Sequence, residues 1–210
     1  MEKYTYNTER TMYQGFEESA LERKDNDCLY YYGSEFSWNQ VYELVNACAA
    51  GLAANGVKEG DRVVICAPNM PQCIAAIYAV NKIGAVASML HPLSVASEAK
   101  HCVNLVGAKF AFCFDVSEKA FDNMDITLVK CKTAEYFPKS PMGLIYKLGY
   151  AKKIKGKTAE AHVSKKLDWQ DFIKQGRDYI AKNGEVETKG TPKSLAAIMM
   201  TGGTTGNPKG

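Results

Sequence analysis

The sequence predicts an α/β fold: a largely parallel sheet of βαβ type flanked by helices. From residue 62 to residue 130, short apolar runs typical of strands alternate with segments of helical periodicity, each about a dozen residues long. Glycine stands at positions 56, 84 and 107, directly after helical segments, where it can end a helix. This alternation is typical of right-handed βαβ units, whose strands lie parallel in one sheet.

The first part of the chain predicts two helices separated by a hairpin. The first helix covers residues 11–23, and two short runs, 29–32 and 35–36, predict the hairpin. Ser37 and Gln40 are spaced as a capping box at the start of the second helix, which Gly56 stops. The core-facing stripe of this helix is Val41, Leu44, Val45, Cys48 and Leu52.

The middle of the chain predicts the parallel strands, at 62–67, 85–90, 109–114 and 126–130. After the first strand, Asn69 is the expected cap and Pro71 the first residue of a helix that ends at Gly84. A further helix covers 95–106 and ends at Gly107. Residues 168–183 predict one or two packed helices, and residues 195–200 predict a short buried strand.

Composition indicates an ordinary globular protein. The chain has 210 residues, of which 46% are hydrophobic and 23% charged, enough for one sizeable core. A net charge of +3 is too small to imply a nucleic-acid partner. The N-terminus has no signal-peptide pattern, and the apolar stretch 72–90 contains Asn81 and Lys82, so a helix followed by a strand explains it better than a membrane span.

Seven cysteines, an odd number without a C-x-x-C pair, are expected to be reduced core residues of a cytoplasmic protein. Only three histidines occur and none has the spacing of zinc ligands. His91 at a strand end and His101 within a helix are expected to be structural rather than catalytic.

A lysine-rich insertion is predicted at 134–168, where the strand–helix rhythm breaks. Between residues 136 and 167 eight lysines stand against one acid, Glu160. Residues 142–150 are apolar with helical spacing, so the segment 139–157 predicts a basic amphipathic helix. Such a helix can lie on an anionic bilayer, or it can be a solvated insertion that packs its apolar side on the domain. The residues leave both interpretations open.

The last ten residues predict a phosphate-binding loop at 201–210, directly after the apolar run 195–200. Four glycines let backbone N–H groups approach an oxyanion, three threonine hydroxyls add donors, and Lys209 offsets the charge of the ligand. The Walker pattern fails, because Pro208 stands before the lysine and Gly210 follows it. The dinucleotide fingerprint fails as well, and the alternative is a surface turn without function.

The string Thr-Gly-Gly-Thr-Thr-Gly-Asn-Pro-Lys-Gly closely resembles the phosphate loop of the adenylate-forming superfamily, which includes acyl-CoA synthetases, luciferases and peptide-synthetase adenylation domains. Met200 stands where that family usually has an aromatic residue, and Gly202 is common in its fatty acyl-CoA ligases. Weaker resemblances follow in order along the chain: Phe36-Ser37-Trp38, Gly60-Asp61-Arg62-Val63, Gly84-Ala85 through His91-Pro92-Leu93, with His91 in place of the usual Asn, and Gly107-Ala108-Lys109.

The resemblance implies that this chain is the N-terminal part of a larger α/β domain, incomplete at its C-terminal end. It implies that the loop holds the β- and γ-phosphates of ATP and that Thr201 contacts Mg²⁺. The implied phosphate-binding residues are Thr201, Gly202, Gly203, Thr204, Thr205, Gly206 and Lys209. The adenine pocket, the Mg²⁺-binding glutamate and the catalytic lysine of the family would lie beyond residue 210, so no catalytic residue is expected in this chain.

The resemblance therefore implies an ATP-dependent acyl-CoA synthetase. Such an enzyme activates a carboxylic acid, here a fatty acid, as acyl-adenylate and transfers it to coenzyme A. The alternatives are another adenylate-forming ligase, for an aryl acid, an amino acid or an acyl-carrier protein, and a phosphate-binding module without catalysis. The expected location is the cytoplasm, with peripheral contact to the inner face of a membrane through 139–157. The residues leave the acid, the acceptor thiol and the oligomeric state open.

Overall fold

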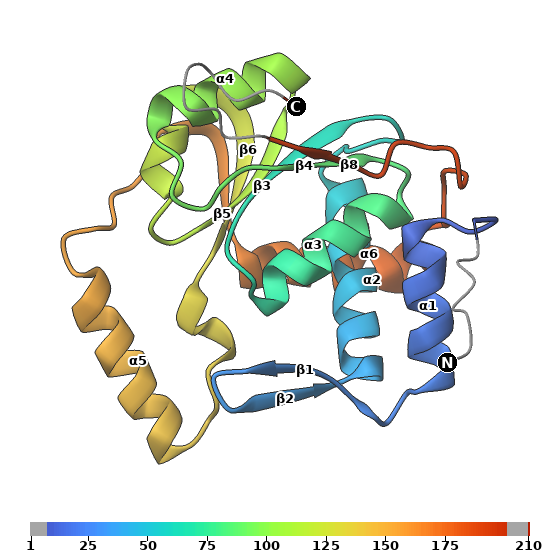
Figure 1. Ribbon diagram of the computed structural model, residues 1–210, viewed down its shortest axis with the longest axis horizontal. Coiled ribbons are helices and arrows are strands. Elements are labelled where there is room, and N and C mark those ends of the chain that lie inside the picture. Colours follow the sequence, from blue (N-terminus) through green and yellow to red (C-terminus); the bar gives the residue numbers. More distant parts are fainter. Residues whose placement is uncertain (1–7, 201–209) are drawn as a thin grey trace, which may run out of the picture.

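The computed structural model describes residues 8–200 and Gly210. Its centre is a sheet of parallel strands (Figure 1), which confirms the predicted α/β class. The order across the sheet is β7-β6-β5-β3-β4-β8, and every neighbouring pair is parallel. The strands are β3 (Arg62–Cys66), β4 (Val86–Met89), β5 (Phe110–Phe114), β6 (Met124–Cys131), β7 (Val163–Asp168) and β8 (Ala197–Met199). The predicted hairpin is present as β1 (Asp27–Tyr31) and β2 (Ser34–Ser37).

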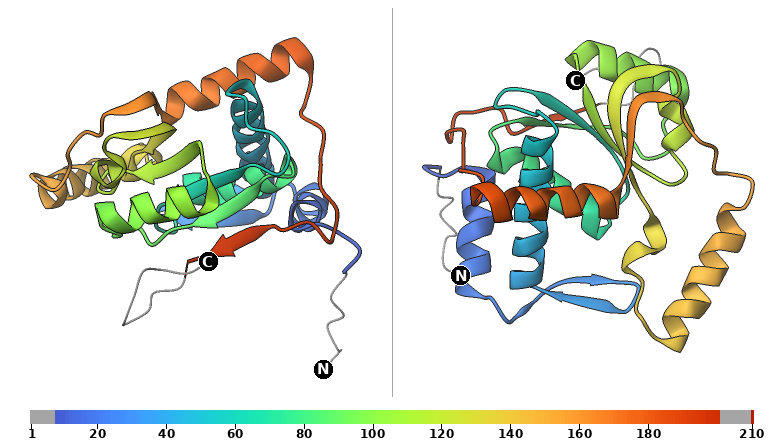
Figure 2. Two further views of the ribbon diagram at one scale, coloured as in Figure 1. Left: turned by 90° about the horizontal axis from the view of Figure 1, so that it is seen from above. Right: turned by 180° about the vertical axis from the view of Figure 1, so that it is seen from behind.

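Helices cover both faces of this sheet (Figure 2). They are α1 (Met12–Glu22), α2 (Trp38–Ala54), α3 (Pro71–Lys82), α4 (Ala96–Val106), α5 (Pro141–Ile154) and α6 (Trp169–Asn183), with the 3-10 turns η1 (Glu118–Phe121) and η2 (Thr133–Tyr136). Side chains of α1, α2, α3 and α6 share one core with Val63 and Ile65 of β3. Those of α4 and η1 share a second core with Val64 and Cys66 of the same strand. The alternation along β3 therefore divides the interior into two layers.

The local signals for helix ends agree with the structure, with one exception. Ser37 and Gln40 form the capping box: the Ser37 N–H donates to Gln40 Oε1 at 2.9 Å, and the Gln40 N–H donates to Ser37 Oγ at 3.3 Å. Gly107 ends α4 in the left-handed conformation, with φ 63°. Asn69 was the wrong choice of cap. Pro71 is the first helical residue as predicted, so the N-cap is Met70, which makes no side-chain capping bond.

The two edge strands differ from the prediction. Strand β7 was not predicted, because its centre, Lys165 and Lys166, is exposed and polar, and only Val163 and Leu167 are half-buried. It nevertheless pairs with β6 and lies within the lysine-rich segment. Strand β8 was predicted to be buried, but it is the opposite edge, and Met199 is 65% exposed. In the described part of the chain, β8 has β4 on one side and no strand on the other.

Helices α2 and α6 pack unusually closely because each has a glycine at the contact. A methyl group added to Gly176 of α6 would lie 1.9 Å from the carbonyl oxygen of Ala47, and one added to Gly51 of α2 would lie 2.7 Å from the Phe172 ring. This approach buries Trp169 and Phe172 completely, and both rings contact Phe112 of β5. The glycine pair thus sets the spacing of the layer that covers the centre of the sheet.

A buried carboxylate ties the other side of the sheet together. Glu118 is 1% exposed; it pairs with Lys130 of β6 at 2.8 Å and Lys166 of β7 at 3.1 Å and accepts the backbone N–H of Ala161 at 3.1 Å. Burial alone would raise the pKa of Glu118, but these donors outweigh it and hold the pKa below its ordinary value. Glu118 is therefore ionised at neutral pH and links η1 to two strands.

All seven cysteines are free thiols, and all except Cys28 are buried. Cys48, Cys73 and Cys131 belong to the core shared by α1, α2, α3 and α6. Cys66, Cys102 and Cys113 belong to the core under α4. Burial raises the pKa of each of the six, so these thiols stay protonated at neutral pH.

We expect Gly176→Ala to lower the free energy of unfolding by at least about 2 kcal/mol, because the new methyl group forces α2 and α6 apart. The matched control is Gly149→Ala on α5, where the added methyl group meets nothing within 4 Å. That change should instead stabilise the protein by about 0.5–1 kcal/mol through helix propensity. Urea unfolding followed by circular dichroism measures both, and equal effects would contradict the close contact.

We expect Glu118→Gln to cost about 2 kcal/mol or more at pH 7, because it leaves Lys130 without its buried partner. The control Glu160→Gln removes an 80% exposed carboxylate from the same Lys166 and should cost less than about 1 kcal/mol. Since the pKa of Glu118 is lowered on folding, its contribution is present above the ordinary value of 4.5 and is lost as the pH falls through the folded-state pKa. The gap between wild type and Glu118→Gln should therefore shrink in acid, and a gap that widens would contradict this role.

Candidate functional site

The strand that precedes the predicted phosphate loop ends at the carboxyl edge of the sheet. Strand β8 runs parallel to β4, with Ala197 opposite Ala87 and Met199 opposite Met89. The chain therefore continues from Met200 at the same edge at which β4 ends. In open parallel sheets, ligands bind outside this edge.

The loop residues themselves lie outside the described residues. This applies to the whole predicted set: Thr201, Gly202, Gly203, Thr204, Thr205, Gly206 and Lys209. The structure describes the two flanks, Met200 and Gly210. Met200 packs with Ile198 against the core under α4, and its N–H donates to the carbonyl of Met89 at 3.4 Å. Gly210 lies against the side chains of the same Ile198 and Met200, so both flanks meet at the end of β8.

The segment after β4 is fixed by hydrogen bonds at the same edge. Leu90 donates its N–H to Ile65, and the Cys66 thiol donates to the carbonyl of His91 at 3.4 Å. Nδ1 of His91 accepts the N–H of Leu93 at 3.1 Å. Burial raises the pKa of Cys66 to about 12, so this thiol is a hydrogen-bond donor and not a nucleophile at neutral pH. His91 thus shapes this turn, while His101 is half-buried on α4.

A cavity of about 300 Å³ opens at this edge between two loops that are distant in sequence. Its lining includes Pro92, Leu93 and Val95 from the loop after β4, and Val116, Ser117 and Lys119 from the loop after β5. Leu93 and Val95 are 69% and 59% exposed. Sequence reasoning missed this cavity, because only the order of the strands brings the two loops together. The cavity, the turn at His91 and the flanks of the predicted loop form the candidate site.

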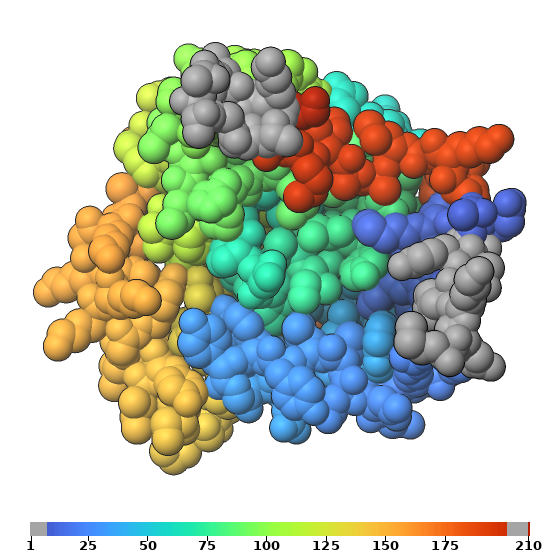
Figure 3. Space-filling view, viewed as in Figure 1, coloured from blue at the N-terminus to red at the C-terminus, as the bar shows by residue number. Residues whose placement is uncertain are grey.

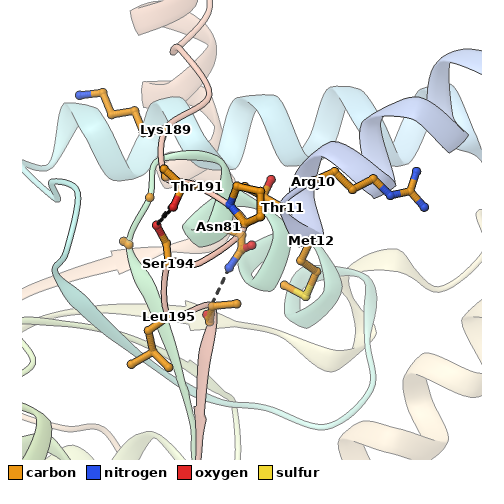
Figure 4. Close-up of a pocket in the computed structure, with 13 residues that line it drawn as sticks. Arg10, Thr11, Met12, Asn81, Lys189, Thr191, Ser194 and Leu195 are labelled. Carbon is orange, nitrogen blue, oxygen red and sulfur yellow. Dashed lines mark hydrogen bonds between the residues drawn. The ribbon is translucent and has the colours of Figure 1, made fainter. Parts of the chain in front are cut away.

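The approach to β8 is held by a second group of contacts (Figure 4). Asn81 at the end of α3 donates its amide to the carbonyl of Ala196 at 3.2 Å, and the Ser194 hydroxyl accepts the N–H of Thr191 at 2.8 Å. The cavity between these residues and Arg10 measures about 70 Å³. That is room for about two water molecules, so it suits a structural role rather than a substrate.

A larger cavity of about 410 Å³ lies at the opposite, amino edge of the sheet. Two of its cations have partners: Arg62 donates to the carbonyls of Val106 and Gly60, and Lys109 pairs with Asp125 at 2.7 Å. Its place at the amino edge separates it from the end of β8.

Within the described ranges, 8–200 and 210, no group of three histidine, cysteine or carboxylate side chains could hold a metal ion. Over the same part of the chain, no helix has the length and apolarity that crossing a membrane requires. The Mg²⁺ contact expected of Thr201 lies outside this part.

Curated relatives include CoA ligases for different acids. The chain is 24% identical over 210 residues to the long-chain-fatty-acid–CoA ligase of Bacillus subtilis. The match covers 96% of this chain and 36% of that protein. It is 27% identical over 199 residues to the acetyl-coenzyme A synthetase of Caulobacter vibrioides, with 90% of this chain and 28% of the relative covered. The chain thus spans about a third of the length of these relatives.

Solved structures share the fold. The N-terminal domain of FACL13 from Mycobacterium tuberculosis superposes with a TM-score of 0.65 at 22% identity, covering 95% of this chain and 43% of that one. The anthranilate CoA ligase AuaEII gives a TM-score of 0.65 at 16% identity, covering 97% of this chain and 34% of that one.

The sequence model of one family covers almost the whole chain. The family is described as "AMP-binding enzyme", and the match runs from residue 16 to residue 210, so it includes the sheet, both helical layers and the predicted loop. The chain therefore belongs to the AMP-binding enzyme family.

Proposed function

We propose that the complete protein is an ATP-dependent acyl-CoA synthetase that activates a fatty acid as acyl-adenylate and transfers it to coenzyme A. The observation that carries the proposal is the position of β8, the strand before the loop sequence: it ends at the carboxyl edge, next to the turn after β4. The names of the curated relatives support a CoA ligase, and the Bacillus subtilis relative is a long-chain-fatty-acid–CoA ligase.

In this proposal the chain supplies phosphate binding. Carboxylate attack on the α-phosphate brings two anions together and develops charge on the departing pyrophosphate. Backbone N–H groups at Gly202, Gly203 and Gly206, the hydroxyls of Thr204 and Thr205, and the Lys209 ammonium would bind the β- and γ-phosphates and so stabilise that charge.

Mg²⁺ would neutralise further phosphate charge when bound. The Thr201 hydroxyl suits it, because Mg²⁺ prefers oxygen ligands and takes several of them from phosphates and water. The pairing of β8 with β4 fixes the strand that precedes the loop sequence.

The second candidate stays within the same chemistry but changes the acid. An anthranilate CoA ligase and an acetyl-coenzyme A synthetase are among the similar proteins, so an aryl acid or another small acid is the alternative substrate, as are amino acids and acyl-carrier-protein acceptors. Pyrophosphate exchange by the complete protein with a panel of acids separates these. A phosphate-binding module without catalysis would show no exchange with any acid.

The proposed location is the cytoplasm, with peripheral contact to the inner face of a membrane. A fatty acid partitions into bilayers, so an enzyme that uses it gains access at a lipid surface. The lysine-rich segment 139–157 is the part of the chain that we propose for this contact.

We expect Lys209→Ala in the complete protein to lower the adenylation rate at sub-saturating ATP by roughly tenfold or more, since one charge-assisted contact to phosphate is lost. The matched control is Lys193→Ala, which removes an exposed lysine shortly before β8 and should leave the rate unchanged. Pyrophosphate exchange measures the rate, and the melting temperature should be the same for both variants. A wild-type rate for Lys209→Ala would contradict the assignment of the loop.

We expect the 210-residue chain by itself to form no acyl-adenylate. Phosphate contacts alone cannot orient a carboxylate for in-line attack, and the chain spans only 36% of its Bacillus subtilis relative. The test incubates the purified chain with ATP, Mg²⁺ and a set of fatty acids and traps any adenylate with hydroxylamine. Hydroxamate above a control without protein would refute this expectation.

A further inference from the structure

Helix α5 turns large apolar side chains to solvent. Met142, Leu144, Ile145 and Leu148 are 54%, 58%, 60% and 63% exposed. Figure 3 shows the segment that contains them protruding at one side of the molecule. Isolated exposed apolar residues are ordinary, but Leu144, Ile145 and Leu148 lie on one side of the helix and form an apolar patch, which is typical of an interaction surface.

The opposite face of α5 is firmly attached, so the direction of the apolar patch is fixed. The Tyr150 hydroxyl bonds Asp115 Oδ1 at 2.6 Å and Thr133 Oγ1 at 2.8 Å. Gly143 is buried against the backbone of Pro138, and the Tyr146 ring contacts Phe137. At about 100° per residue, 143, 146 and 150 share the inner face, and 144, 145 and 148 lie opposite. The solvated-insertion alternative requires the apolar side of α5 to pack on the domain. The patch lies on the opposite side, so it does not pack there.

Cations surround the patch. At about 100° per residue Lys152 shares the side of the patch, Lys147 and Lys153 lie between that side and the inner face, and Lys155 and Lys157 follow the C-terminal end of the helix. All five are exposed, and no carboxylate in the part of the chain that the structure describes pairs with any of them.

We propose that this face of α5 docks on an anionic lipid bilayer. Its apolar side chains would enter the boundary between headgroups and acyl chains, while its lysines contact lipid phosphates. A second copy of the chain fits the face poorly, because it would bring two sets of five unpaired lysines together. The charge pattern suits a surface that is both apolar and negatively charged.

The attachment of α5 connects the bilayer to the candidate site. Asp115 directly follows β5, and Thr133 lies just beyond β6, so Tyr150 bonds to the carboxyl edge of the sheet. A bilayer-bound α5 would hold this edge close to the lipid surface. The inference rests on the proposed function in one respect only: the advantage of this arrangement is access to a fatty acid dissolved in the bilayer.

The test is co-sedimentation of the 210-residue chain with vesicles, without ATP or fatty acid. One set of vesicles contains phosphatidylcholine alone, and the other also contains phosphatidylglycerol. We expect binding to the anionic set, released by salt because the attraction of lysines is screened. Leu144→Ser/Leu148→Ser should weaken binding at least about tenfold. Lys152→Gln/Lys153→Gln should weaken it about fivefold per lysine.

Matched controls lie elsewhere on the surface. Leu21→Ser/Leu105→Ser alters two leucines that are 51% and 54% exposed on α1 and α4, and Lys174→Gln/Lys182→Gln alters two exposed lysines of α6. Both pairs should bind as wild type does. Equal losses in controls and α5 variants, no binding, or equal binding to both vesicle sets would overturn the proposal.

Two further measurements separate other partners of the patch. If Leu144→Ser/Leu148→Ser lowers the mass of the chain in sedimentation equilibrium, the partner is a second copy and the proposal fails. If the complete protein does not bind although the 210-residue chain does, another part of the protein covers α5 and the proposal also fails. A complete protein with Lys209→Ala should still bind vesicles, so failure of the ligase proposal and failure of lipid docking are distinguishable.

Discussion

The contact between α2 and α6 is the constraint on which the rest of the fold depends. Gly51 and Gly176 allow the two helices to approach almost backbone to backbone. At that spacing α6 presses Trp169 and Phe172 onto β5, and the Trp169 indole N–H reaches the Tyr136 hydroxyl at 2.9 Å. Since α6 follows β7 directly, the same contact holds the edge strand in register with β6. Larger residues at either glycine would force α2 and α6 apart and so disturb the packing of this helical layer on the sheet.

The loop after β5 connects the parts of the structure that surround the candidate site. Asp115 accepts bonds from Thr133 and Tyr150 and so attaches α5. The Ser117 hydroxyl donates to the carbonyl of Cys66 at the end of β3. Glu118 pairs with β6 and β7. These three residues thus contact three strands and one helix, while neighbouring side chains line the cavity at the carboxyl edge. A substitution in this loop would therefore alter the candidate site and the attachment of α5 together.

Much of the fold could be predicted, because its signals are local. The capping box at Ser37, the glycine that ends α4 at Gly107 and the apolar run of β3 all depend on residues close in sequence. Strand β7 was missed because an edge strand can expose charged side chains, and the exposure of β8 was missed because apolar residues also occur at edges. The ten-residue loop lies outside the described residues and stays a prediction from its composition and order. The cavity at the carboxyl edge was not predicted, because its two loops are brought together only by the order of the strands.

The distribution of the buried thiols has a practical consequence. Three lie in the core on the α2 side of the sheet and three in the core under α4, and in the folded state none of them is accessible to an alkylating reagent. A thiol in such a place reacts only when its surroundings open, so the rate of alkylation at each position reports the free energy of that opening. Mass spectrometry of the labelled peptides would then show whether the two layers open separately or as one cooperative unit. The chain carries its own probes for that question, one set on each face of the sheet.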